Sequence, residues 1–97
     1  MAAYMIAQIE IRDAAGYDQY RKQVLPTIQA FDGRVLAAEQ RPDIAEGEWP
    51  YEMTVIIEWP STERARQWYD SDEYAEPKAL RKRVSKANLA FLRGLPR

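Results

Sequence analysis

The beginning of the chain alternates between apolar side chains and a mixed set, which is the pattern of a β-strand. Between Tyr4 and Arg12, one face collects the apolar residues Met5, Ala7, Ile9 and Ile11, because successive side chains of a strand point to opposite faces. The other face carries Tyr4, Ile6, Gln8 and Glu10. The pattern predicts a strand with one fully buried face and a second face that is only partly polar.

A helical pattern follows this strand. Asp13 is a suitable N-cap, because its carboxylate can accept hydrogen bonds from the first free backbone N–H groups of a helix. Apolar and aromatic residues then recur every three or four positions as one stripe, formed by Tyr17, Tyr20, Val24, Ile28 and Phe31. The predicted helix runs to about Phe31 and stops at Gly33. Pro26 is expected to bend it without ending it, since the stripe continues beyond that residue.

The remaining elements are two strands, a broken helical region and a last strand. Strands are predicted at 34–40 and 52–59, joined by a long segment that contains Pro42, Gly47 and Pro50 and is expected to be mobile. Ser61 caps the next helix, which is expected to break between Asp70 and Glu76. A new helix then starts either at a second cap, Ser71, or near Pro77. Residues 86–92 form the last strand, with Ala87, Leu89 and Phe91 on one face.

This order of elements predicts an α+β fold of the ferredoxin-like βαββαβ type, formed as a single domain over residues 1–97. Its four-stranded antiparallel sheet carries the helices on one face. The opposite face would hold Tyr4, Ile6, Thr54 and Ile56, which is too apolar a surface for a small domain to leave in water. We therefore expect two sheets to pack face to face in a homodimer.

Four segments of the sequence resemble successive motifs of one protein family over nearly the whole chain. The segments GYDQYRKQVLPTI, FDGRVL, EGEWP and EWPSTERARQWYDSDEY are similar to those of the small bacterial proteins grouped as domain of unknown function 1330. The resemblance implies a dimeric α/β barrel, with a ligand site in each subunit between the sheet and the helices. The wider group includes haem-degrading enzymes, cofactor-free monooxygenases and muconolactone isomerases, and this chain lacks the histidine that would bind haem iron.

Composition excludes several kinds of chemistry. The chain of 97 residues contains no histidine and no cysteine, which removes imidazole relays, cysteine nucleophiles, disulfides and His/Cys metal sites. A formal net charge of -1 does not favour nucleic acid as a partner. No apolar run has the length of a membrane helix. The N-terminus resembles no signal peptide, so a cytoplasmic location is expected, and no cofactor or metal motif is recognised.

Tyrosines and one arginine are the first candidates for a ligand site. Tyr17 and Tyr20 match the paired tyrosines of the family's first helix, and their hydroxyls could hold a polar ligand or donate a proton. Their helical spacing favours the alternative, in which they are packing residues with hydroxyls at the rim. Arg34 could bind a carboxylate or an enolate through its planar guanidinium, or it could form a salt bridge with Glu10 or Glu58.

A second group of candidates lies in the loop and in the second helical region. Trp49 could act as a lid, as an anchor between subunits, or as a local packing residue. Tyr69 and Tyr74 could line a pocket, whereas Trp68 is expected in the core. The basic run Arg81, Lys82, Arg83 and Lys86 is interpreted as a solvated surface near a helix C-terminus.

Two functions fit these features, and a third has little support. The first is a dimer that binds a small molecule between the sheet and the helices, using Tyr17, Tyr20, Arg34, Trp49, Tyr69 and Tyr74. The second is a cofactor-free monooxygenase or isomerase acting on an aromatic or enolisable substrate, because such chemistry needs a dry pocket and donors for a developing oxyanion. A structural adaptor has no support beyond the expected dimer.

Overall fold

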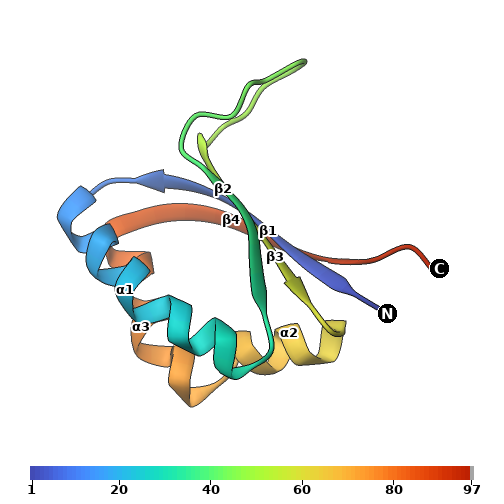
Figure 1. Cartoon of the computed structure of the whole chain (residues 1–97). Helices are drawn as coiled ribbons and strands as arrows, with labels where there is room; N and C mark the ends of the chain where they lie inside the picture. The colour runs from blue at the N-terminus through green and yellow to red at the C-terminus, as the bar shows by residue number, and fades with distance from the viewer. Residues whose placement is uncertain (97) are drawn as a thin grey trace.

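The computed structural model describes residues 1–96, and its elements follow the predicted order except that the second helical region forms two helices (Figure 1). The elements are β1 Ala3–Ile11, α1 Ala14–Ala30, β2 Arg34–Glu39, β3 Met53–Trp59, α2 Thr62–Tyr69, α3 Asp72–Val84 and β4 Ser85–Arg93. All three helices lie on one side of the sheet, and the loop between β2 and β3 extends beyond the sheet's end (Figure 1).

The four strands form one antiparallel sheet in the order β2-β3-β1-β4, which is the ferredoxin-like arrangement. β1 is central, and Ile6 lies opposite Ile56 of β3 and Ala90 of β4. The pairing of β2 with β3 shifts between Val35 and Ala37, so one extra residue enters β2 as a β-bulge.

The predicted faces of β1 are confirmed. Ala3, Met5, Ala7 and Ile9 of β1 are buried against the helices, on what we call the inner face of the sheet. Tyr4, Ile6 and Gln8 lie on the opposite, outer face, where the register places them beside Glu58, Ile56 and Thr54 of β3. These outer residues of β1 are only half-buried in the single chain, because the helices cover the inner face and leave the outer face uncovered.

Helix α1 begins and ends at the residues that the sequence indicates. The Asp13 carboxylate accepts a hydrogen bond from the backbone N–H of Gly16, and Pro26 lies inside the helix. After the helix, Gly33 passes so close to Trp59 and Ile28 that an added Cβ would lie 2.6 Å and 2.7 Å from their side-chain atoms. A glycine is therefore required where the chain turns from α1 into β2.

The expected break from Asp70 to Glu76 is too long, because the interruption covers only Asp70 and Ser71. The Ser71 hydroxyl accepts a hydrogen bond from the backbone N–H of Tyr74 and so starts α3 at Asp72. Pro77 therefore lies inside α3, not at its start. The burial of Tyr74 and Pro77 stabilises this helix although the proline removes one of its hydrogen bonds.

An aromatic cluster fills the core between the helices and the sheet. Trp59, Trp68 and Tyr74 are the largest fully buried side chains, and Trp68 stacks on Tyr74 with ring centroids 4.0 Å apart. The Trp68 indole N–H donates to the Thr27 hydroxyl at 3.0 Å, which satisfies its only polar group.

Within residues 1–96, none of the helices combines the length and the apolar character needed to cross a membrane.

Candidate functional site

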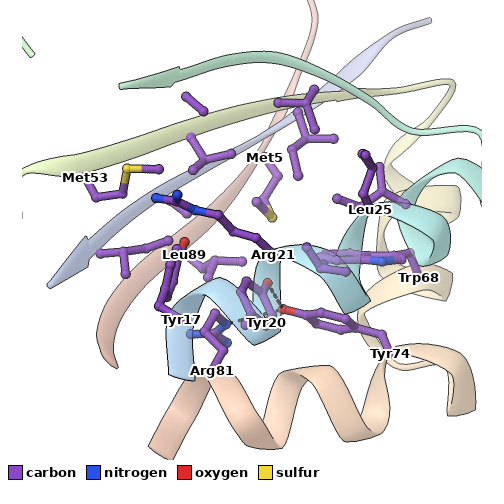
Figure 2. A pocket seen from close by; sticks show the side chains of 18 residues that line it. Met5, Tyr17, Tyr20, Arg21, Leu25, Met53, Trp68, Tyr74, Arg81 and Leu89 are labelled. Carbon is purple, nitrogen blue, oxygen red and sulfur yellow. Dashed lines mark hydrogen bonds between the residues drawn. The ribbon is translucent and has the colours of Figure 1, made fainter. Parts of the chain in front are cut away.

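A cavity of about 200 Å³ lies between the inner face of the sheet and the helices (Figure 2). Its walls come from all seven elements, since the side chains that line it are Met5, Ala7, Ile9, Tyr17, Tyr20, Arg21, Val24, Leu25, Ile28, Val35, Ala38, Met53, Val55, Ile57, Trp68, Tyr74, Arg81 and Leu89. Most of these side chains are apolar, and none of them is a carboxylate. The cavity is therefore an apolar chamber with a few polar groups.

The cavity is open at the edge of the sheet formed by β2. Helix α1 packs mainly against α3, and every residue of β2 remains exposed. Leu25 of α1 is 45% exposed and Val35 of β2 is 39% exposed, although both line the cavity. These two side chains mark the mouth of the cavity between α1 and β2.

Two tyrosines and an arginine form a polar end of the cavity, away from this mouth. The hydroxyl oxygens of Tyr20 and Tyr74 are 2.9 Å apart, and the Arg81 Nε–H donates to the Tyr74 hydroxyl at 3.3 Å. Figure 2 shows Tyr20 projecting from α1 toward Tyr74, with Arg81 beside the pair. The Tyr17 ring packs against that of Tyr20, with centroids 5.4 Å apart.

Arg81 corrects the interpretation of the basic run as a solvated surface. Lys82, Arg83 and Lys86 are exposed, but Arg81 is only 4% exposed. The buried residues of α3 are Tyr74, Pro77, Arg81 and Val84, and steps of three or four place them on one helical face. This spacing was the signal that could have identified Arg81 from the sequence.

Burial changes the acid–base properties of the polar groups. Burial, followed by the neighbouring Tyr74, raises the pKa of Tyr20 well above its ordinary value. Burial also raises the pKa of Tyr17, although Arg21 and Arg81 oppose this effect. For Arg81, burial lowers the pKa, but Tyr74 and then Tyr20 outweigh it, so its pKa is raised overall. At neutral pH the site therefore combines neutral phenols with a charged guanidinium.

The structure brings three of the six predicted site residues to the cavity. Tyr17, Tyr20 and Tyr74 line it. Tyr69 instead packs behind Tyr74, with its ring 5.9 Å from that of Phe91 and 4.2 Å from the Lys78 ammonium. Tyr69 thus supports the aromatic cluster and does not line the cavity.

The prediction that Arg34 lines a pocket beneath the first helix is wrong. Arg34 lies on the outer face of β2, where its guanidinium pairs with the Glu58 carboxylate at 2.8 Å, one of the salt bridges considered from the sequence. Its side chain is 73% exposed. Because side chains alternate along a strand, the next residue, Val35, lines the cavity instead.

Trp49 also lies away from the cavity. Its indole N–H donates to the Thr54 hydroxyl at 2.9 Å, and Thr54 is an outer-face residue paired with Gln8. Trp49 is 37% exposed. Trp49 therefore does not cover the cavity, because its hydrogen bond holds it beside the outer face of the sheet.

No cluster of three or more acidic side chains that could hold a metal ion occurs in the part of the chain that the structure describes. The polar groups that could contact a bound molecule are the Tyr17, Tyr20 and Tyr74 hydroxyls and the Arg21 and Arg81 guanidinium groups. Among these, Arg81 combines charge with burial. Arg21 lies near the mouth, where its side chain is 42% exposed and its Nη1 is 3.6 Å from Oδ1 of Asp18.

Comparisons with known proteins identify the family and the fold. A family model described as domain of unknown function DUF1330 matches residues 2–95, and a search of curated proteins found no match. A protein of unknown function from Rhodopseudomonas palustris is similar, with 18% identity, a TM-score of 0.79 and coverage of 99% of this chain and 84% of that one.

Two further solved structures share the fold at lower identity. A dimeric ferredoxin-like protein of unknown function from Jannaschia sp. has 6% identity, a TM-score of 0.69 and coverage of 97% of this chain and 100% of the other. SnoaB from Streptomyces nogalater, described as a cofactor-independent oxygenase, has 10% identity, a TM-score of 0.64 and coverage of 99% and 95%. At these identities the likeness is one of fold.

Proposed function

The chain belongs to the DUF1330 family, whose function is not known, and we propose that it binds a small organic molecule in the cavity between the sheet and its helices. One observation carries this proposal. An apolar chamber of about 200 Å³ lies between the sheet and the helices of a small domain and opens beside β2, where side chains would normally pack without large voids. An apolar cavity of about 150 Å³ accepts benzene, so this one has room for a substituted aromatic ring.

Binding is favoured over catalysis because the cavity lacks a base. None of the lining residues is an Asp or a Glu, the chain has no histidine, and the pKa of both Tyr17 and Tyr20 is raised. Proton abstraction near neutral pH needs a group that is unprotonated there. The residues that line the cavity therefore supply donors and apolar contacts but no general base.

A cofactor-free monooxygenase or isomerase is the second candidate. The Tyr20, Tyr74 and Arg81 donors favour it, because donors of this kind stabilise a developing oxyanion in a dry site, and SnoaB shares the fold. Deuterium uptake next to the carbonyl of 2-indanone, followed by NMR in D2O, tests whether the protein accelerates enolisation. Acceleration that is lost in Arg81→Met would favour the enzyme over a simple binding protein.

We propose further that two copies pack through the outer face of the sheet. Ile6 and Ile56 lie side by side at its centre, and Leu92 of β4 is 44% exposed there. An apolar face left uncovered by the helices is a typical subunit contact, and the Jannaschia neighbour is dimeric. Trp49, held beside this face by Thr54, is then placed to act as an anchor between subunits.

Toluene is a suitable first probe of the cavity, because it matches the volume and has no polar group. The protein is labelled with 13C at the methionine methyls and at isoleucine δ1. Binding is expected to shift the signals of Met5 and Met53, which line the cavity, and to leave Ile44 of the β2–β3 loop unchanged. Unchanged Met5 and Met53 signals at toluene saturation would contradict the proposed function.

A matched pair of variants tests whether toluene occupies this cavity. Ala38 lines the mouth and is exposed, so Ala38→Trp is expected to fill the entrance without removing core contacts. Ala75 is an exposed residue of α3 outside the cavity, so Ala75→Trp adds the same side chain elsewhere. Toluene binding should weaken in Ala38→Trp and remain unchanged in Ala75→Trp.

A further inference from the structure

Arg81 is a buried cation for which the described chain provides no anion. It is 4% exposed, and within residues 1–96 no carboxylate oxygen lies within 4.0 Å of its guanidinium. The one hydrogen bond of its guanidinium among these residues runs from Nε to the Tyr74 hydroxyl. A buried charge is normally paired with an opposite charge. Arg81 is buried like a member of an ion pair, but none of the described carboxylates pairs with it.

The hydroxyls beside Arg81 also leave a donor unused. Tyr20 and Tyr74 are joined by a single hydrogen bond, in which either oxygen can be the donor. Two hydroxyls carry two hydrogens, and one bond between them uses only one. Whichever tyrosine donates, the other retains a free O–H. The polar end of the cavity thus holds one unused hydroxyl hydrogen and the Arg81 guanidinium, whose terminal nitrogens donate to none of the described residues.

The rest of the cavity suits a flat apolar body. The stacked rings of Trp68 and Tyr74 form one wall, and methionine and aliphatic side chains of β1 and β3, including Met5 and Met53, form the opposite one (Figure 2). Arg21 lies at the mouth, with its guanidinium carbon 5.1 Å from the centre of the Tyr17 ring. Its positive charge would attract an anion toward the opening.

We infer that the molecule bound in this cavity carries a carboxylate on an aromatic body of about one ring, and that Arg81 and the Tyr20–Tyr74 pair receive the carboxylate. This inference rests on the proposed binding function and adds the class of ligand. A carboxylate supplies two acceptor oxygens and a negative charge, which match the donors and the charge of a planar guanidinium.

The position of Arg81 near the end of α3 offers a purely structural explanation. Arg81 lies in the last turn of the helix, where a positive charge is favourable because of the exposed carbonyl groups. That role predicts no preference for an anionic ligand. Charge selectivity in binding therefore separates the two roles of Arg81.

Benzoate and benzamide form the probe pair, since they differ little in shape but only benzoate is charged. We expect the wild-type protein to bind benzoate about tenfold or more tightly than benzamide, judged by titration of the Met5 and Met53 methyl signals. Arg81→Met should abolish this preference. Lys82→Met removes the same charge from the adjacent, exposed position and should retain the preference.

The outcomes distinguish this inference from the proposal on which it rests. If toluene shifts Met5 and Met53 but benzoate binds no more tightly than benzamide to the wild-type protein, the carboxylate assignment is wrong and the binding function stands. If no probe shifts these signals, both are wrong. If Arg81→Met does not fold, Arg81→Lys replaces it, because lysine keeps the charge but lacks the planar guanidinium. A preference for benzoate over benzamide below half of the wild-type value would support the assignment. An unchanged preference would overturn it.

Discussion

The hydroxyl oxygens of Tyr20 in α1 and Tyr74 in α3 lie 2.9 Å apart in the buried interior, although 54 positions separate the two residues in the sequence. Arg81 joins them through its Nε–H, which donates to Tyr74 at 3.3 Å. The hydrogen bond between Tyr20 and Tyr74 connects α1 with α3 at one end of the cavity. The same three groups therefore connect α1 with α3 and line the candidate site.

Removing the hydroxyls should reveal how strongly they are coupled. Tyr20→Phe is expected to lower the free energy of unfolding by about 1 kcal/mol, the usual contribution of one hydrogen bond. Tyr74→Phe should lower it by about 1 to 3 kcal/mol, because it leaves both the Tyr20 hydroxyl and the Arg81 Nε–H without their partner. Urea denaturation of the two variants and their double mutant measures these values. Strictly additive effects would contradict a direct contact.

The buried tyrosine should make the protein sensitive to alkali. Because the pKa of Tyr20 is raised in the folded state by burial and by Tyr74, its contribution to stability is fully present below the ordinary tyrosine pKa of about 10. That contribution is lost as the pH rises from about 10 toward the higher pKa of the folded state. Denaturation at a series of pH values should show this fall, and Tyr20→Phe should fall less steeply. Equal slopes would mean that Tyr20 is not the group responsible.

A charge on the outer face of the sheet should disrupt the proposed dimer. Ile6→Lys places an ammonium opposite Ile56 and Ala90 at the centre of that face, where its burial in a subunit contact would be unfavourable. Sedimentation equilibrium at micromolar protein should find monomers or insoluble protein. Ala75→Lys, on the exposed side of α3, is the control and should stay dimeric. A folded Ile6→Lys dimer would show that another surface forms the contact.

Replacing Arg34 should have little effect on either stability or binding. The Arg34–Glu58 pair is an exposed salt bridge on the outer face, with the arginine side chain 73% exposed, and such pairs contribute about 0 to 1 kcal/mol. Arg34→Ala is therefore expected to change the free energy of unfolding by less than about 1 kcal/mol. Its affinity for benzoate, measured by the methyl signals of Met5 and Met53, should equal that of the wild type. A marked loss of affinity would return Arg34 to the site.

The helix caps and the faces of β1 could be predicted because they depend on neighbours in the sequence. Asp13 and Ser71 accept hydrogen bonds from backbone N–H groups three residues ahead, and the alternation along β1 decides which side chains are buried. Local spacing of this kind is present in the sequence itself. The same spacing identifies Tyr17 and Tyr20 as inward-facing residues.

The composition of the site depends on contacts that only the tertiary structure decides. The prediction for Arg34 names the inner face, whereas the residue lies on the outer face. The side on which a residue of β2 lies is determined by its register with β3 and by the bulge between Val35 and Ala37. Arg81 was assigned to solvent because a basic residue is favourable at a helix end whether or not that end is exposed. Its burial follows from the packing of α3 on α1, which brings Tyr20 and Tyr74 together and closes one end of the cavity. The sequence by itself determined the order of the elements and the buried face of β1, since periodicity is local, whereas the pairing of distant elements decided which polar groups meet.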